Sequence, residues 1–130
     1  MDRLQGKTAV ITGGSTGIGL ASARRFMEEG AFVFIFGRRR EALDAALAEL
    51  GPNARAVQGD VAKLEDLDRL FEAVKAERGS IDVLFANAGI GSIAALGSIT
   101  PEDFDHVFGI NVRGTLFTVQ KGLALMNKGG

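Results

Sequence analysis

The sequence predicts an α/β fold organised as a doubly wound parallel sheet, and three observations predict it. The apolar run at residues 9–11 leads into a glycine-rich turn at residues 12–19, and an amphipathic stretch follows at residues 20–29. Short apolar runs then alternate with segments of helical periodicity along all 130 residues. A strand, a glycine turn and a helix in that order form the first unit of a doubly wound domain, and continued alternation gives parallel strands with right-handed crossovers.

The first two strands are expected in the interior of the sheet. Residues 8–12 form a short apolar strand that we expect to be buried on both faces. The helix over residues 18–29 has one apolar side, and Gly30 ends it. Its charged side chains are expected to face solvent: Arg24, Arg25, Glu28 and Glu29. Residues 32–36 are all apolar and lack a polar helical face, which is typical of an interior parallel strand.

The next elements follow the same alternation. Residues 41–50 have leucines at helical spacing and residues 51–53, Gly-Pro-Asn, end the helix. A short strand is expected at residues 54–58, and a third helix over residues 63–78. The expected buried side chains of these two helices are Leu43, Leu47, Leu50, Leu64, Leu67, Leu70, Phe71 and Val74. A fourth strand is expected at residues 81–86.

The last helix is unusual in its apolar content. Thr100 is expected as its N-cap, with Pro101 in the first turn and Asp103 as the capping-box partner. The helix is expected to run from about residue 101 to 126, and its apolar residues exceed a single stripe. We therefore expect cover on more than one side, partly from the core and partly from a subunit interface.

The composition excludes several classes of function. A net charge of −1 argues against nucleic acid as a partner and against an electrostatic membrane anchor. The absence of cysteine excludes disulfides and thiolate metal sites, and a single histidine, His106, excludes a histidine-rich metal site. No apolar run approaches the length of a membrane span, so a cytoplasmic protein is expected.

The glycine-rich turn predicts a phosphate-binding site. Gly13 permits the tight turn off the strand, Gly17 lets the backbone approach a pyrophosphate, and Gly19 lets the helix pack closely on the sheet. The other binding candidates of this turn are Ser15, Thr16 and Ile18. The spacing G-x-x-x-G-x-G differs from the G-x-G-x-x-G of the standard dinucleotide fingerprint, and a glycine turn without a ligand is the alternative interpretation.

With its leading threonine, this turn resembles the TGxxxGIG motif of the classical short-chain dehydrogenase/reductase family. The resemblance extends over essentially the whole chain but reaches only the family's N-terminal, cofactor-binding half. It implies a Rossmann-like sheet of about four strands in the order 3-2-1-4, in one NAD(P)-binding domain over residues 1–130. It also implies an oxidoreductase that transfers hydride between a nicotinamide and a small-molecule carbonyl or alcohol substrate.

The end of the second strand indicates which dinucleotide would bind. An acidic residue there would accept hydrogen bonds from the adenosine ribose and repel a 2′-phosphate. Gly37 occupies that position, and the guanidinium of Arg38 suits bidentate phosphate contact, so NADP(H) is favoured over NAD(H). Arg39 and Arg40 are interpreted as the solvated start of a helix.

The ends of the third and fourth strands carry two more motifs of the family. Asp60 and Val61 resemble its adenine site, where a carboxylate accepts the exocyclic amine and a backbone N–H reaches a ring nitrogen. The alternative is Asp60 as a turn or helix-capping residue. The resemblance implies that the amide of Asn87 ties neighbouring strands, and that Ala88 and Gly89 leave room for the nicotinamide-side ribose.

Asn111 is an isolated polar residue among apolar neighbours, and burying it without partners would be costly. By its pattern alone it is a satisfied core amide. The resemblance implies instead that it interrupts the last helix and holds a water in a proton relay.

The family's remaining catalytic residues have no match in the sequence. The family uses a tyrosine as general acid/base, a lysine that lowers the pKa of that tyrosine, and a serine that polarises the carbonyl. The sequence contains no tyrosine, and we expect the 130-residue chain alone to lack the catalytic half and to be inactive. The fourth strand would then have an unpaired apolar edge, which favours a homo-oligomer. Two alternatives stay open: a noncatalytic dinucleotide-binding or regulatory module, and a self-assembling protein that uses only the last helix.

Overall fold

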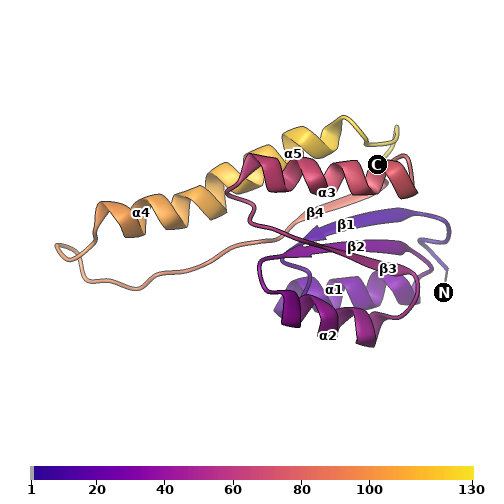
Figure 1. Cartoon of the computed structure of the whole chain (residues 1–130), viewed down its shortest axis with the longest axis horizontal. Helices are drawn as coiled ribbons and strands as arrows, with labels where there is room; N and C mark the ends of the chain where they lie inside the picture. The colour runs from indigo at the N-terminus through magenta and orange to yellow at the C-terminus, as the bar shows by residue number, and fades with distance from the viewer. Residues whose placement is uncertain (1) are drawn as a thin grey trace.

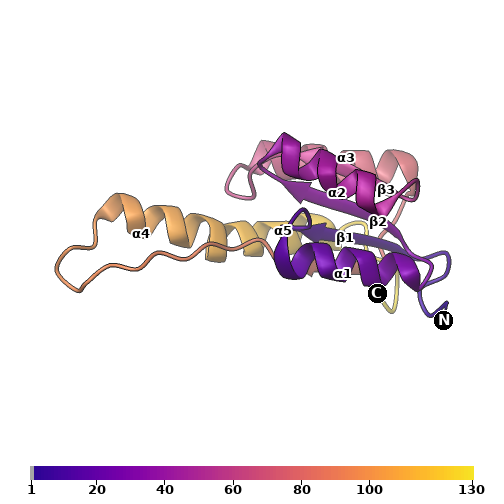
Figure 2. The same ribbon diagram turned by 90° about the horizontal axis from the view of Figure 1, so that it is seen from below.

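The computed structural model describes residues 2–130 and contains a four-stranded parallel sheet with helices on both faces (Figure 1). The strands are β1 (Thr8–Thr12), β2 (Phe32–Gly37), β3 (Ala54–Gln58) and β4 (Val83–Ala86). Their order is β3-β2-β1-β4, which confirms the predicted 3-2-1-4 arrangement. Helices α1 (Gly17–Glu28) and α2 (Arg40–Leu50) cover one face, and α3 (Leu64–Glu77) and α5 (Thr115–Leu123) cover the other (Figures 1 and 2).

The strands send alternate side chains into two core layers, because successive residues of a strand point to opposite faces. Val10 of β1 packs in the layer that contains Leu67 of α3. Its neighbours Ala9 and Ile11 pack in the layer that contains Leu43 of α2. All five residues of β1 are buried, which confirms the expectation of a strand covered on both sides.

The fourth strand begins two residues later than expected. Ile81 is fully buried but makes an isolated parallel bridge with Met126, outside the β1–β4 ladder. The carboxylate of Asp82 accepts a hydrogen bond from the Thr8 N–H at 2.9 Å and so closes the β1–β4 pairing at this end.

The expectation that Glu29 faces solvent is wrong, because its side chain is buried. The carboxylate accepts a hydrogen bond from the Arg3 N–H at 3.0 Å and pairs with the Arg25 guanidinium. The hydrogen bond from Arg3 lowers the pKa of Glu29, and partners of this kind allow a charge to be buried. Helical periodicity could not show that the N-terminal segment packs against this end of α1.

The expected single helix over residues 101–126 is three consecutive segments. Helix α4 (Pro101–Phe108) is followed by a π-helical turn, η1 (Gly109–Gly114), and then by α5. The predicted N-cap is confirmed, since Thr100 Oγ1 accepts a hydrogen bond from the Asp103 N–H at 3.1 Å. Across residues 2–130, no helix has both the length and the apolar character needed to cross a bilayer.

Helix α4 and the loop before it project away from the sheet (Figures 1 and 2). No residue of α4 is buried. The single chain supplies only the core side of the expected cover, at buried residues of η1 and α5. The uncovered face of α4, η1 and α5 forms what we call the apolar stripe: Phe104, Phe108, Val112, Leu116, Val119 and Leu123. Cover of this stripe by a second subunit stays a prediction.

Candidate functional site

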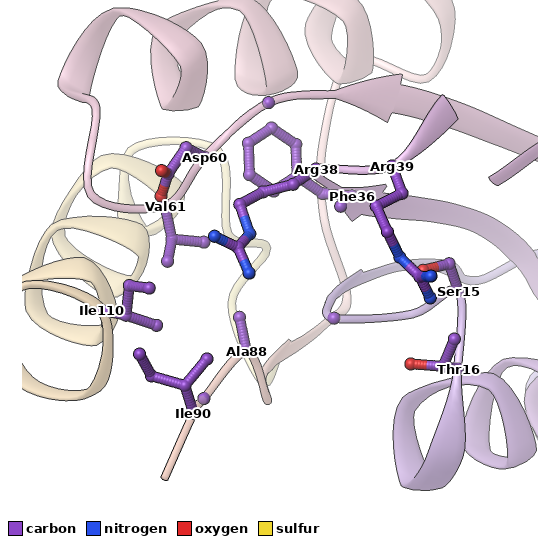
Figure 3. Close-up of a pocket in the computed structure, with 14 residues that line it drawn as sticks. Ser15, Thr16, Phe36, Arg38, Arg39, Asp60, Val61, Ala88, Ile90 and Ile110 are labelled. Carbon is purple, nitrogen blue, oxygen red and sulfur yellow. The ribbon is translucent and has the colours of Figure 1, made fainter. Parts of the chain in front are cut away.

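A cleft lies at the carboxyl ends of the strands, where open α/β sheets bind ligands. Its volume is about 160 Å³, and Figure 3 shows side chains entering it from several separate segments. The lining residues are Gly13, Ser15, Thr16, Phe36, Gly37, Arg38, Arg39, Gly59, Asp60, Val61, Ala88, Gly89, Ile90 and Ile110. The cleft therefore gathers the turn after β1 and the segments that follow β2, β3 and β4.

Three of the glycines in the first turn, Gly13, Gly17 and Gly19, meet different constraints. Gly13 has a φ of +67°, and a Cβ there would lie 3.0 Å from the Cα of Ala88. A Cβ on Gly19 would overlap the Gly13 carbonyl oxygen, so only glycine permits this contact between helix and turn. Gly17 has a φ of +56° and open space around it. The predicted tight turn and close helix packing are both present.

The N-terminus of α1 is open at the edge of the cleft. Thr16 is the N-cap residue, but its side chain makes no capping hydrogen bond, and the first turn contains no acidic residue. The first N–H groups of a helix carry a partial positive charge and lack intrahelical partners. This end of the cleft therefore suits an anion. Ile18 is 73% exposed and points away from the core.

Thr12 and Asn87 tie β1 to the segment after β4. Thr12 Oγ1 accepts hydrogen bonds from the N–H groups of Asn87 and Ala88, each at 3.1 Å. The Asn87 amide donates to the Gly13 carbonyl oxygen at 3.3 Å, which is the strand-tying role predicted for it. The sequence did not predict the part of Thr12, because nothing in a strand's pattern shows which main-chain groups its last side chain will meet.

Two arginines enter the cleft from the end of β2. Figure 3 shows the guanidinium of Arg38 within the cleft and that of Arg39 extending toward Ser15. Among residues 2–130, neither forms an ion pair with a carboxylate, whereas Arg40 pairs with Asp44 at 3.5 Å. Arg39 is the N-cap residue of α2 and Arg40 is its first residue, and both are exposed, so the expected solvated helix start is confirmed. Arg39 also lines the cleft, which the sequence did not predict.

The turn after β3 presents Asp60 and Val61 to the cleft. Asp60 Oδ1 accepts a hydrogen bond from the Ala62 N–H at 2.9 Å, so the turn role that was the alternative interpretation of Asp60 is present. Asp66 Oδ2 accepts a hydrogen bond from the Asp60 N–H at 2.9 Å, and Asp66 Oδ1 accepts one from Arg69. These two bonds, the backbone one first, lower the pKa of Asp66. The turn is thus held by two carboxylates, that of Asp60 within the turn and that of Asp66 in α3.

Asn111 lies in η1 and is exposed, which differs from a buried core amide. Its Oδ1 accepts a hydrogen bond from the Ile90 N–H at 2.8 Å, and its Nδ2 donates to the Ile90 carbonyl oxygen at 2.7 Å. The side chain therefore pairs with one main-chain unit of the segment after β4. The interruption of the helix that the family resemblance implied is present as the π-helical turn.

The structure brings most of the candidate residues together. Those that line the cleft are Gly13, Ser15, Thr16, Arg38, Asp60, Val61, Ala88 and Gly89. Those that do not line it are Gly17, Ile18, Gly19, Asn87 and Asn111. Lining residues that the sequence did not point to are Phe36, Arg39, Gly59, Ile90 and Ile110. Phe36 and Gly59 adjoin a predicted strand end, and that adjacency is the signal that could have found them.

Comparison with known proteins agrees with this geometry. A family model described as short chain dehydrogenase matches residues 7–130. Oxidoreductase asL5 of Sarocladium schorii is 67% identical over 130 residues, which are all of this chain and 52% of that protein. Sorbitol dehydrogenase of Cereibacter sphaeroides is 44% identical over 128 residues, 98% of this chain and 50% of that protein. The chain spans about half the length of these curated relatives.

A solved structure shows the same arrangement. The 3-ketoacyl-(acyl-carrier-protein) reductase from Brucella melitensis, complexed with NADH, superimposes with a TM-score of 0.90 at 37% identity. The match covers 94% of this chain and 51% of that one. The likeness therefore extends over the sheet and the cleft together.

Proposed function

The chain belongs to the short chain dehydrogenase family, and we propose that it binds NADP(H) in the cleft for hydride transfer between the nicotinamide and a carbonyl or alcohol carbon. The observation that carries the proposal is the meeting of an uncapped helix N-terminus with Arg38 and Arg39 at one cleft. Such a set of groups attracts phosphate, and relatives of the chain are named as dehydrogenases.

The residues present fit the phosphates of such a cofactor. Open space at Gly17 and the uncapped start of α1 favour the pyrophosphate. Arg38 and Arg39 have no carboxylate partner within residues 2–130, so their guanidinium groups remain available to a ribose 2′-phosphate. Gly37 offers that phosphate no opposing carboxylate.

The other side of the cleft fits the adenine base and the nicotinamide-side ribose. We assign Asp60 and the Val61 N–H to the adenine edge, and Ala88 and Gly89 to the nicotinamide-side ribose, which small residues leave room for. The bound cofactor would supply or accept the hydride. We assign Asn111 to the orientation of the relay water, and we propose that the 130-residue chain alone does not turn over, because it contains no tyrosine.

The experiment that tests this function compares NADPH and NADH binding by isothermal titration calorimetry. We expect NADPH to bind more tightly, and Arg38→Ala to weaken NADPH binding about tenfold or more while changing NADH binding less than about threefold. Arg24→Ala, a charge-matched change on the outer face of α1, is the control and leaves both affinities unchanged. Equal losses for the two cofactors in Arg38→Ala would refute the assignment of a 2′-phosphate site.

We also propose that the apolar stripe is buried against a second copy of the chain. Six exposed apolar side chains follow one another over α4, η1 and α5, and exposed patches of this extent mark interaction sites. A cytoplasmic location is proposed as well, and fractionation of cells that produce the tagged chain would test it.

A further inference from the structure

The turn that presents Asp60 and Val61 receives support from a distant part of the chain. We call residues 60–63 the adenine turn. Within it, the Lys63 N–H donates to the Asp60 carbonyl oxygen at 2.9 Å, and the Ala62 N–H donates to the Asp60 carboxylate. These bonds are local and fix the curvature of the turn. They leave its position relative to the rest of the cleft to contacts from elsewhere.

One such contact is the hydrogen bond from the Asp60 N–H to the Asp66 carboxylate of α3, and the π-helical turn η1 supplies others. The Arg113 Nη1 donates to the Ala62 carbonyl oxygen at 2.9 Å, across 51 positions in the sequence. The same guanidinium stands over the Phe117 ring, 5.3 Å from its centroid, so its direction is set by two partners. A Cβ on Gly114 would lie 2.8 Å from Val61 Cγ2, which shows how closely η1 approaches the turn.

Packing and hydrogen bonding act on the same short segment. Val61 is 6% exposed and packs in the core cluster that contains Ile110, and Figure 3 shows the two side chains on adjoining walls of the cleft. Arg113 is exposed, so it adds little to the core itself. Its hydrogen bond acts on the Ala62 carbonyl oxygen, one residue after Val61 in the turn.

From these contacts we infer that Arg113 is a positioning residue for the adenine-reading edge formed by the Asp60 carboxylate and the Val61 N–H. The inference rests on the proposed function. The donor–acceptor pattern of that edge matches adenine, which offers an amine donor beside a ring-nitrogen acceptor. Hypoxanthine instead presents a carbonyl acceptor to the Asp60 carboxylate and a ring N–H donor to the Val61 N–H. Neither hydrogen bond can then form. Discrimination between the two bases therefore reports the placement of the edge.

The experiment measures binding of NADPH, its hypoxanthine analogue and NADH to the full chain by isothermal titration calorimetry. The wild type should prefer adenine to hypoxanthine by at least about tenfold, because the analogue leaves both edge groups unpaired. In Arg113→Met that preference should fall about fivefold, while the NADPH to NADH ratio stays unchanged. Arg113→Lys keeps a donor and should restore most of the preference.

Arg55→Met is the matched control. Arg55 also donates to main-chain carbonyl oxygens, of Pro52 at 2.8 Å and Ala54 at 2.9 Å, and stands 5.0 Å from the Phe32 ring centroid. It lies outside the cleft lining, so its loss should lower thermal stability with no change in base preference. An unchanged preference in Arg113→Met would overturn the positioning role and leave the proposed function standing. A wild type that binds no dinucleotide would overturn both.

Discussion

At the scale of single residues, available space separates side chains that the sequence treats alike. Gly17 and Gly19 belong to one motif, yet a Cβ at Gly19 would meet a carbonyl oxygen and a Cβ at Gly17 would meet nothing within 4 Å. The constraint at Gly17 is its positive φ, whereas the constraint at Gly19 is contact. Glycine at the two positions is thus required for two separable reasons, packing in one case and conformation in the other.

Gly19→Ala should lower the free energy of unfolding by about 2–3 kcal/mol, because the added methyl forces the helix away from the Gly13 carbonyl oxygen. Urea denaturation followed by far-UV circular dichroism measures the change. Gly109→Ala is the control, since Gly109 has a helical φ of −59° and a Cβ there meets nothing within 4 Å. It should be neutral or stabilising by up to about 1 kcal/mol. Equal losses in both variants would contradict the contact argument.

The carboxylate of Asp66 gives the stability of the chain a defined acid dependence. Its pKa lies below the ordinary 3.8, because it accepts hydrogen bonds from the Asp60 N–H and from Arg69. Its contribution is therefore fully present above pH 3.8 and is lost as the pH falls through the lowered pKa.

Asp66→Asn should lower the free energy of unfolding by about 1 kcal/mol at pH 7, since one charged acceptor becomes neutral. The difference from the wild type should shrink as the pH falls below 3.8, where the native carboxylate also takes up a proton. Urea unfolding at a series of pH values between 2.5 and 7 (on the order of five points) gives the two profiles. Parallel profiles across the series would argue against this role for Asp66.

The sequence predicted the parts of the candidate site that depend on residue type. It predicted less well the parts that depend on the direction in which a side chain points. The turn of Gly13, the strand-tying amide of Asn87 and the position of Asp60 at the cleft all followed from sequence. The position of Arg39 in the cleft did not follow from sequence, because three successive arginines look equivalent until the end of β2 directs each side chain differently.

At the scale of elements, strands were easier to predict than helix continuity. The bounds of β1 and β3 match the expected residues, since each is a short run between turn residues. The apolar periodicity of the last helix runs through Asn111 and predicts one continuous helix, whereas only the family resemblance implies an interruption there. The structure places the π-helical turn there, where the Asn111 side chain pairs with the main chain of Ile90. A long-range pairing of that kind leaves no mark in helical periodicity.

Asn111→Ala should release the segment after β4 from η1, because it removes both hydrogen bonds to Ile90. We expect the free energy of unfolding to fall by about 1–2 kcal/mol and the Ile90 amide to exchange with solvent faster. Hydrogen exchange measured by NMR reports that amide directly. Gln120→Ala, an exposed change on α5, is the control and should leave the exchange at Ile90 unaltered. Unaltered exchange in Asn111→Ala as well would contradict the pairing.

At the scale of the whole molecule, the two layers of helices are not equally complete. Helices α1 and α2 lie against the sheet, whereas α4 extends past it with no buried residue (Figure 2). In η1 and α5, the side toward α3 and β4 consists of Ile110, Gly114, Thr118 and Gly122. Gly122 approaches closely enough that a Cβ would lie 2.7 Å from Leu84 Cδ2. The small and buried residues on one side of this helical segment allow it to pack closely within the chain. The apolar stripe lies on another side of the segment.

Leu116→Glu should weaken self-association of the chain about a hundredfold, because it places a charge in the centre of the apolar stripe, where Leu116 is 55% exposed in the single chain. Sedimentation equilibrium over a range of protein concentrations measures the dissociation constant. Ile93→Glu is the matched control, since Ile93 is fully exposed in the loop before α4 and does not belong to the stripe. It should leave association unchanged. Because Leu116 faces away from the core, far-UV circular dichroism of the variant should match the wild type, so a loss of association reports the surface itself. A wild type that stays monomeric at all concentrations would refute the second-copy proposal, and a Leu116→Glu variant that associates as tightly as the wild type would show that another face is used.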